Sequence, residues 1–222
     1  MNVKQAYNIW ADKYDTDINL TRDLEAAVLR ETLGNIHFKT CLEIGCGTGK
    51  NTEWLITRAD HITAVDFSDE MISKAKKKIN SDKVNFQLSD ITQDWTFVKR
   101  QYDLVTFSLV LEHTEDLEMI FNQLSGAVSP GGHIYIGELH PFKQYQGSKA
   151  RFETEKGLHT LTCFNHHISD FIIPAKRNGF VLTEINEHFD DDDRTNVPRI
   201  LSILFSKPSF YLNAELNIKL SC

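Results

Sequence analysis

Long apolar runs, disulfide spacing and an excess of positive charge are all missing from this chain of 222 residues. No window approaches the roughly 20 apolar residues that a membrane-spanning helix needs, and the first residues lack the apolar core of a secretory signal. The four cysteines show no C-x-x-C spacing and form no evident disulfide framework. We therefore expect a cytoplasmic protein without a membrane span.

Positive charge is the scarcer sign, and the formal net charge is −7. This balance disfavours a broad phosphate-binding surface, so we expect no nucleic-acid partner. The longest basic run, at residues 74–78, lies on a predicted helix and reads as its solvated face. Apolar residues make up 41% and charged residues 25% of the chain, which is typical of one globular domain of this length.

Residues 42–52, LEIGCGTGKNT, are the most informative stretch of the sequence. Apolar residues lead into a Gly-x-Gly-x-Gly turn, and the polar run behind it predicts a helix over 49–58. Glycine has no Cβ, so a ligand can lie against the bare backbone at the start of that helix. Glu43 would repel a pyrophosphate but can help to hold an ammonium group. These features predict a nucleoside cofactor with a positive charge, as in S-adenosylmethionine.

Two further acids follow predicted strands. Asp66 ends the strand 61–66, at 17 residues beyond Gly49, where a carboxylate can accept hydrogen bonds from both ribose hydroxyls. A helix N-cap would also explain Asp66, although Ser68 already supplies one. Asp90 follows the strand 83–88 and can accept the exocyclic amine of adenine, with Ile91 packed on the ring.

Strands and helices alternate along the chain, which predicts an α/β fold. We expect a Rossmann-like, seven-stranded, mostly parallel sheet with an antiparallel last strand and helices on both faces. The expected strands are 40–45, 61–66, 83–88, 102–108, 133–137, 180–185 and 200–205, and the main helices after 49–58 are 69–80, 115–128 and 168–178. Ligands bind such sheets at the carboxyl ends of the strands, where Glu43, Asp66, Asp90, Ser108 and His140 all fall.

The whole chain, 1–222, reads as one domain with an N-terminal helical cap at 1–37, a core at 38–140, a substrate lid at 141–163 and a C-terminal helix and strand pair at 164–207. Within the cap, Tyr7, Trp10 and Tyr14 share one face of a helix predicted over 5–15. They either dock that helix or form an aromatic lid over a cationic sulfonium. Arg22 either clamps a carboxylate or is solvated.

In combination and order, the segments 43–49, 65–68, 90–91, 102–105 and 130–132 resemble those of the class I S-adenosylmethionine-dependent methyltransferases. The resemblance is to the small-molecule branch, of the type 11 and type 25 kind, and covers roughly residues 5–140. It implies that the glycine loop lines the methionine and ribose portions of the cofactor. It also implies that Ser108 and Leu109 lie beside the sulfonium. The expected cofactor-binding residues are Tyr14, Arg22, Glu43, Gly45, Cys46, Gly47, Gly49, Asp66, Phe67, Met71, Asp90, Ile91, Ser108 and Leu109.

The acceptor is expected to be a small molecule, free or tethered to a carrier, that offers a hydroxyl, carboxyl or amine. His140 is the candidate general base for a hydroxyl or an ammonium, or else it satisfies loop backbone groups. His113 either caps the helix after the strand 102–108 or lines the pocket. The expected substrate residues are Tyr7, Trp10, His113, Tyr145 and Arg151.

Residues 190–193, DDDD, with His188 nearby, offer metal ligands. Consecutive aspartates cannot all face one ion, so we expect a solvated acidic loop and no metal. Two other functions share the glycine turn. An NAD-dependent oxidoreductase would normally space its glycines G-x-G-x-x-G, and a regulatory protein would bind the cofactor without catalysis. A monomer and a homodimer are both compatible with the sequence.

Overall fold

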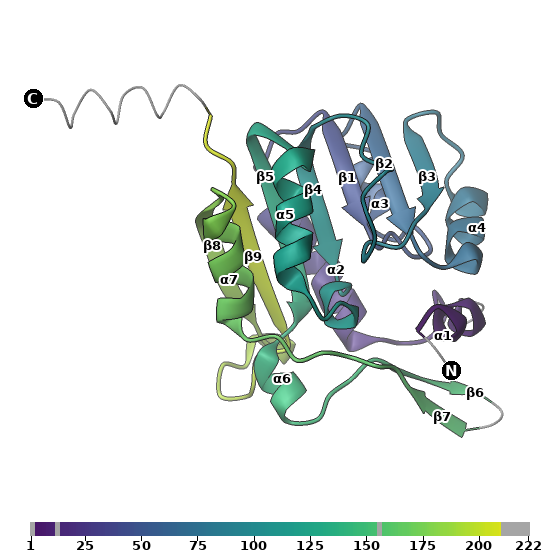
Figure 1. Cartoon of the computed structure of the whole chain (residues 1–222). Helices are drawn as coiled ribbons and strands as arrows, with labels where there is room; N and C mark the ends of the chain where they lie inside the picture. The colour runs from purple at the N-terminus through teal and green to yellow at the C-terminus, as the bar shows by residue number, and fades with distance from the viewer. Residues whose placement is uncertain (1–2, 12–13, 155–156, 210–222) are drawn as a thin grey trace, which may run out of the picture.

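The computed structural model describes residues 3–11, 14–154 and 157–209. A seven-stranded sheet with the order β3-β2-β1-β4-β5-β9-β8 forms its centre, and β6 and β7 make a separate hairpin (Figure 1). The β9 strand runs antiparallel to both β5 and β8, whereas the other neighbours are parallel, which confirms the predicted fold class. The strands are β1 Thr40–Ile44, β2 His61–Asp66, β3 Val84–Leu88, β4 Tyr102–Ser108, β5 Val128–Leu139, β6 Arg151–Thr154, β7 Gly157–Thr160, β8 Val181–His188 and β9 Ile200–Ser206.

Helices cover both faces of the sheet (Figure 1). The α5 and α7 helices pack on one face, and α2 packs against β5 and β9 on the other. No helix of the described ranges has the length and apolarity needed to cross a membrane. The helices are α1 Val3–Trp10, α2 Leu20–Thr32, α3 Thr52–Leu55, α4 Asp69–Lys78, α5 Leu117–Ala127, α6 Pro141–Tyr145 and α7 Ile168–Arg177, with short 3₁₀ turns at Leu111–His113 and Asp190–Asp192.

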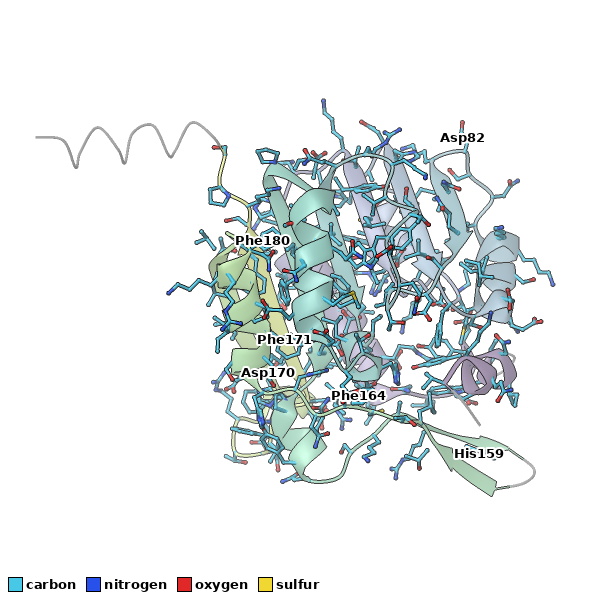
Figure 2. All side chains as sticks on the ribbon, viewed as in Figure 1. Asp82, His159, Phe164, Asp170, Phe171 and Phe180 are labelled. Atoms are coloured by element: carbon cyan, nitrogen blue, oxygen red, sulfur yellow. The ribbon has the colours of Figure 1, made fainter. Side chains whose placement is uncertain are left out.

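Each central strand feeds two cores, because successive side chains point to opposite faces. Leu42 and Ile44 of β1 join the α5–α7 core, which also buries Phe171 and Phe180 (Figure 2). Cys41 joins the core under α2 instead. The same alternation places Glu43 on the α2 face of the sheet, where its carboxylate accepts the Thr52 hydroxyl.

The β1 strand pairs with β2 on one side and with β4 on the other. The chain leaves β1 toward β2 on one side and leaves β4 toward β5 on the other. A crevice therefore opens beyond the carboxyl ends of the β1–β4 pair. The α1 and α6 helices and the β6–β7 hairpin all lie beyond this edge of the sheet (Figure 1). The fold therefore encloses a space at the strand ends that carry the predicted site.

The predicted helices are all shorter than expected, and two of these differences concern the predicted site. The helix predicted over 49–58 is the single turn α3, because Gly49 has a left-handed φ of 84° and residues 57 and 58 make only turn-type bonds to Trp54 and Leu55. The N-terminal helix ends at Trp10, so Tyr14 is not on it. Residues 12 and 13, which that prediction included, lie outside the described residues.

The segment 141–163, expected as a lid, contains α6 and the β6–β7 hairpin. Leu161 packs with Ala6 and Trp10 of α1, and Ala150 packs against this cluster. The Leu161 N–H donates to the Ala150 carbonyl at 2.9 Å, which closes the base of the hairpin. Segments far apart in the sequence thus meet over the strand ends.

Candidate functional site

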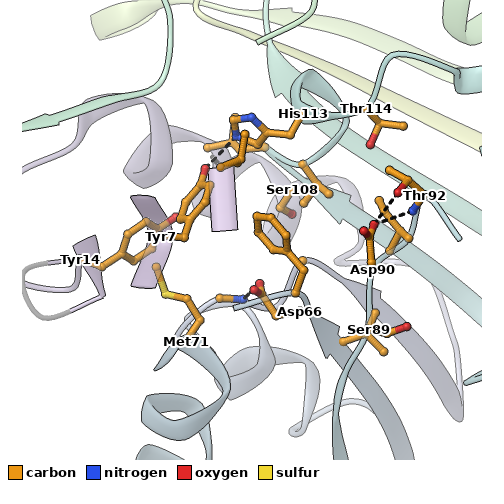
Figure 3. Close-up of a pocket in the computed structure, with 18 residues that line it drawn as sticks. Tyr7, Tyr14, Asp66, Met71, Ser89, Asp90, Thr92, Ser108, His113 and Thr114 are labelled. Carbon is orange, nitrogen blue, oxygen red and sulfur yellow. Dashed lines mark hydrogen bonds between the residues drawn. The ribbon is translucent and has the colours of Figure 1, made fainter. Parts of the chain in front are cut away.

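A cavity of about 210 Å³, called cavity A, opens beyond the carboxyl ends of β1 to β4 (Figure 3). Its lining includes most of the residues expected to bind the cofactor: Tyr14, Gly45, Gly47, Asp66, Phe67, Met71, Asp90, Ile91, Ser108 and Leu109. The fold therefore gathers residues from separate loops around one space.

Asp66 ends β2 and is buried in the wall of cavity A. Its Oδ2 accepts the Gly47 N–H at 2.9 Å, and its Oδ1 accepts the Ser68 N–H at 2.8 Å. Burial raises the pKa of Asp66 to about 6, although backbone hydrogen bonds from Ser68, Gly47 and Phe67 favour the ionised form. The helix cap is provided by Ser68, whose hydroxyl accepts the Met71 N–H at 3.2 Å. Each Asp66 oxygen keeps a further lone pair for a ligand hydroxyl.

Asp90 lies beyond β3 at the edge of cavity A. Its Oδ1 accepts the N–H of Thr92 at 2.9 Å and the hydroxyl of Thr92 at 2.7 Å. Ile91, Phe67 and Met71 supply apolar surface in the same cavity. A carboxylate beside an apolar slot suits a flat heteroaromatic ring that carries an amine.

The glycine loop packs tightly against the end of β4. Gly45 has a φ of 73°, and a Cβ at this position would lie 2.1 Å from Cγ2 of Val110, so only glycine fits. Leu109, directly before Val110, has a φ of 57°. A positive φ in a leucine is strained, and such strain is concentrated at functional sites.

A smaller cavity of about 40 Å³, called cavity C, continues behind the glycine loop. Its polar lining includes Arg22, Glu25, Glu43 and Asn51. Glu43 accepts the Thr52 hydroxyl at 2.6 Å, and burial raises its pKa to about 8. A buried cation would reverse this shift, because it favours the charged carboxylate.

Glu25 was not singled out from the sequence. It is buried on α2, where its carboxylate accepts the Tyr135 hydroxyl at 3.1 Å and the Asn51 amide at 3.2 Å. Burial raises its pKa to about 7. Its spacing from Val28 and Leu29 places it on the inward face of the helix, and a carboxylate on that face is the signal that identifies it.

Arg22 is buried rather than solvated. Its guanidinium donates to the carbonyls of Tyr14 and Asp17 and lies 4.7 Å from the centre of the Tyr14 ring. Its Nε has no hydrogen-bond partner among the described residues. Arg22 therefore holds Tyr14 in place and keeps one donor for a ligand.

The N-terminal aromatic side chains form one cluster, although Tyr14 lies after the helix. The Tyr7 ring centre lies 5.8 Å from that of Trp10, and the Trp10 ring centre lies 5.0 Å from that of Tyr14. The Tyr7 hydroxyl lies 2.8 Å from Nε2 of His113, whose Nδ1 lies 3.1 Å from the Thr162 carbonyl oxygen (Figure 3). Burial raises the pKa of Tyr7 well above its usual value, so its phenol stays protonated.

A third cavity, of about 540 Å³ and called cavity B, lies between α1, the start of α2 and the base of the β6–β7 hairpin. Its size falls in the usual range for small-molecule sites. Of the predicted substrate residues, Tyr7, Trp10 and Arg151 line it, whereas His113 lines cavity A. Tyr145 lines neither and instead hydrogen-bonds to Nδ1 of His167.

The prediction that His140 is the general base does not fit the structure. Its Nδ1 accepts the Phe142 N–H at 3.1 Å and caps α6, and its Nε2 lies 3.1 Å from Oε1 of Glu187. The residue is buried outside the linings of cavities A, B and C. Both ring nitrogens are therefore used in structural contacts, because the chain turns sharply into α6 at this point.

Two predicted cofactor residues in the glycine loop have other positions. Cys46 lines cavity C and not cavity A. Gly49 lines none of the three cavities, and a Cβ there would lie 2.8 Å from Cδ1 of Ile79. Gly49 therefore makes room for the end of α4 rather than for a ligand.

The acidic loop is used for protein contacts. Asp190 pairs with Arg199, and Asp193 accepts the Thr195 N–H at 3.0 Å. Elsewhere, one ligand atom from each of Glu112, His113 and Cys163 lies within 4.8 Å of the others. Burial raises the pKa of the Cys163 thiol to about 12, and both ring nitrogens of His113 already have hydrogen-bond partners, which disfavours a metal there.

The three cavities are adjacent, since Tyr14 and Leu109 line all of them. Residues 42–136 match the family model of a methyltransferase domain. The chain is 25% identical over 201 residues to a malonyl-[acyl-carrier protein] O-methyltransferase of Priestia megaterium. This match covers 83% of this chain and 73% of that protein. It is 29% identical over 145 residues to a ubiquinone biosynthesis O-methyltransferase of Hydrogenovibrio crunogenus, and this second match covers 64% of this chain and 59% of that protein.

Solved structures with a similar fold agree with the methyltransferase match. A complex of DhpI with SAH has a TM-score of 0.71 and 27% identity, and the match covers 93% of this chain and 95% of that one. Residues 42–136 thus match a methyltransferase domain, and the chain resembles the class I S-adenosylmethionine-dependent methyltransferases in sequence and fold. The N-methyltransferase NodS of Bradyrhizobium japonicum, solved with S-adenosylhomocysteine, shares the fold of the methyltransferase, with a TM-score of 0.69, 20% identity and coverage of 94% and 100% of the two chains.

The residues of the methyltransferase fit S-adenosylmethionine as its cofactor. Cavity A offers a carboxylate with free lone pairs, Asp66, next to an apolar slot, and cavity C offers both a buried arginine and buried carboxylates. The methionyl end of the cofactor carries an ammonium and a carboxylate, which suit the carboxylates and the arginine of cavity C. A pyrophosphate there would be repelled by Glu25 and Glu43. The donor set therefore favours this cofactor over a nicotinamide dinucleotide.

Proposed function

We propose that this methyltransferase methylates a small-molecule acceptor, free or tethered to a carrier, bound in cavity B while the cofactor spans cavities A and C. The junction carries this proposal, because Tyr14 and Leu109 line all three cavities. A group at the junction is therefore exposed to the cofactor side and to the acceptor side together.

The cofactor residues follow from their chemistry. Asp66 would accept the ribose hydroxyls, and Asp90 would accept the adenine amine while Ile91 packs on the ring. In cavity C, Nε of Arg22, which lies 3.9 Å from Asp23 Oδ1 but has no hydrogen-bond partner among the described residues, would donate to the methionyl carboxylate. Glu43 would face the ammonium of the methionyl group. Glu25 would lie beside it, where it accepts the Asn51 amide.

S-Adenosylmethionine, when bound, supplies an electrophilic methyl group, and its transfer leaves the carbon–sulfur electron pair on sulfur in S-adenosylhomocysteine. The protein contributes alignment and a dry pocket, which in favourable intramolecular reactions removes roughly 7–11 kcal/mol of a barrier. The rings of Tyr7 and Tyr14 present π-faces that attract a cationic centre. Burial raises the pKa of Tyr14 to about 12, so its phenol is neutral at pH 7.

A hydroxyl acceptor must also lose a proton. The Thr162 carbonyl can only accept, so Nδ1 of His113 carries the hydrogen and Nε2 accepts the Tyr7 hydroxyl. An acceptor hydroxyl that donates to the Tyr7 oxygen would pass its proton to Tyr7, while the proton of Tyr7 moves to Nε2. We therefore assign proton removal to Tyr7 and His113 instead of His140. A carboxylate acceptor needs no such step.

The relatives support an oxygen acceptor, since two are named for O-methylation of a malonyl-carrier and for ubiquinone biosynthesis. Calorimetric titration with S-adenosylhomocysteine and with NAD⁺ tests the cofactor assignment, and we expect binding of the first alone. Release of S-adenosylhomocysteine in the presence of a panel of carboxylic acids, phenols and amines tests catalysis. Binding of NAD⁺ in competition with S-adenosylhomocysteine, or no release across the panel, would contradict the proposal.

A further inference from the structure

Cavity B has a charge opposite to that of the whole molecule. The chain carries a net charge of −7. The described residues that line cavity B nevertheless include Arg22, Lys149, Arg151 and Arg199, with Glu112 as the one acid among them. A cavity lined by one sign of charge attracts ligands of the other sign.

Two of these cations already have protein partners. Arg199 binds Asp190, with its Nη2 at 2.6 Å from Oδ2, and donates from Nη1 to the Thr21 hydroxyl at 3.0 Å. Arg22 donates to two backbone carbonyls and also reaches cavity C. Neither arginine is therefore wholly available to a ligand in cavity B.

Lys149 and Arg151 differ from both arginines. Within the described part of the chain, neither has an ion-pair partner. Ala150 lies between them and packs against the cluster of Trp10 and Leu161, and its carbonyl accepts the Leu161 N–H at 2.9 Å. The backbone between the two cations is thus anchored at Ala150, and the exposed side chains of Lys149 and Arg151 extend from it at the edge of cavity B.

Glu112 is the one acid among the described residues of this lining, and its Oε1 lies 3.7 Å from Nε2 of His113. Glu112 is buried, and its burial raises the pKa of the carboxyl group, which favours the neutral form. Its Oε2 has no hydrogen-bond partner among the described residues. Burial therefore disfavours a negative charge at this position of the lining.

The remaining lining of cavity B includes apolar side chains. Trp10 and Leu139 are buried, while Ile18 is 91% exposed and Leu20 is 61% exposed at its edge. Large aliphatic side chains left in solvent next to a cavity favour an apolar ligand portion. Cavity B therefore combines an apolar side with a cationic side.

We propose that the methyl acceptor of this enzyme is a small amphipathic anion whose carboxylate or phosphate group is held by Lys149 and Arg151. Its apolar part lies against Trp10 and Leu20. This inference rests on the proposed function, which assigns cavity B to the acceptor. Lys149 and Arg151 line cavity B and not cavity A or C, so the anion binds on the side away from the cofactor.

Trp10 provides the readout, because it lines cavity B while Trp54 stacks with Arg58 and Trp95 lies in the core. The full chain, saturated with S-adenosylhomocysteine, is titrated with benzoate, phenyl phosphate and the neutral isostere benzamide while tryptophan fluorescence is recorded. We expect at least one of the two anions to bind tenfold or more tightly than benzamide, and the tighter anion identifies the preferred headgroup. A Trp10→Phe variant must lose the signal.

The variants Lys149→Gln and Arg151→Gln should each weaken binding of that anion by about tenfold to a hundredfold, as expected for loss of one charge-assisted hydrogen bond. Lys77→Gln, on the exposed face of α4, makes the same charge change far from cavity B and should have no effect. Equal binding of benzamide, or unchanged anion affinity in both cavity variants, would overturn the proposal. Failure of the unaltered protein to bind S-adenosylhomocysteine would instead contradict the proposed function.

Discussion

Asp66 offers the sharpest test of the cofactor site. Its two carboxylate oxygens each accept a backbone N–H, from Gly47 at 2.9 Å and Ser68 at 2.8 Å, and line cavity A. Asp66→Asn removes the negative charge and turns one oxygen into an NH₂ group, which faces a backbone donor or the ligand. A hydrogen bond to a charged group contributes about 1.5–3 kcal/mol. Loss of one such bond should weaken S-adenosylhomocysteine binding by about 10-fold to 150-fold.

The pH dependence adds a second signature. Burial raises the pKa of Asp66 to about 6 in the free protein, and the ionised carboxylate is the better acceptor for ribose hydroxyls. Affinity for S-adenosylhomocysteine should therefore fall as the pH drops through about 6 in the unaltered protein. The Asp66→Asn variant should lose this part of the pH dependence, because its amide does not titrate.

Calorimetric titration between pH 5 and 8 measures both effects. Asp69→Asn is the matched control, since this exposed carboxylate lies three positions along the chain and pairs with Lys4 at 2.9 Å. Thermal unfolding of each variant separates loss of binding from loss of fold. Unchanged affinity and an unchanged pH profile in a folded Asp66→Asn protein would refute the assignment of Asp66 to the ribose.

Three further predictions concern residues around the site. The raised pKa of Glu25, about 7, means that the folded protein holds this proton more tightly than the unfolded chain does, so stability should fall as the pH rises from about 4.5 to 7. In the cofactor-free protein, Glu25→Gln should remove that slope and add about 1–3 kcal/mol at pH 8, as measured by urea unfolding at pH 5 and 8. Gly45→Ala should lower the melting temperature because its Cβ would lie 2.1 Å from Cγ2 of Val110. A second substitution, Val110→Ala, should restore part of the loss, and no restoration would show that the backbone φ is the whole cause. His140→Ala should cost about 0.5–2 kcal/mol of stability through the lost cap of α6 and the contact with Glu187, with turnover unchanged. Slower turnover at full stability would return His140 to the catalytic site.

Regular elements were predictable where the sequence pattern and the local backbone agree. The β2 and β4 strands have the predicted bounds, because continuous apolar residues suit central parallel strands. The helix predicted behind the glycine loop is only one turn, because Gly49 takes a left-handed φ and residues 57 and 58 bond to carbonyls three residues back instead of four. The amphipathic spacing of side chains does not predict the left-handed φ of a single residue such as Gly49.

The positions of the acids at the strand ends were also predictable, since parallel strands bring their carboxyl ends to one edge. Which face each side chain uses follows from alternation along a strand, so Glu43 reaches cavity C and not the α5–α7 core. Glu25 was not predicted, because it lies on the α2 helix and not at the end of a strand. Its contacts with Tyr135 and Asn51 exist only after α2 has packed on the sheet.

The order of glycines, acids and strands in this sequence determined the family, the cofactor and the edge of the sheet where they meet, because each of these depends on residues close together in the chain. Tertiary structure alone decided how that edge is divided. The pairing of Tyr7 with His113, the burial of Arg22 and the separation of cavity B from cavity A all depend on contacts between distant segments. His140 has a sequence position suited to catalysis and Tyr145 one suited to substrate binding, yet their side chains bond within the protein, because packing fixes where a side chain points.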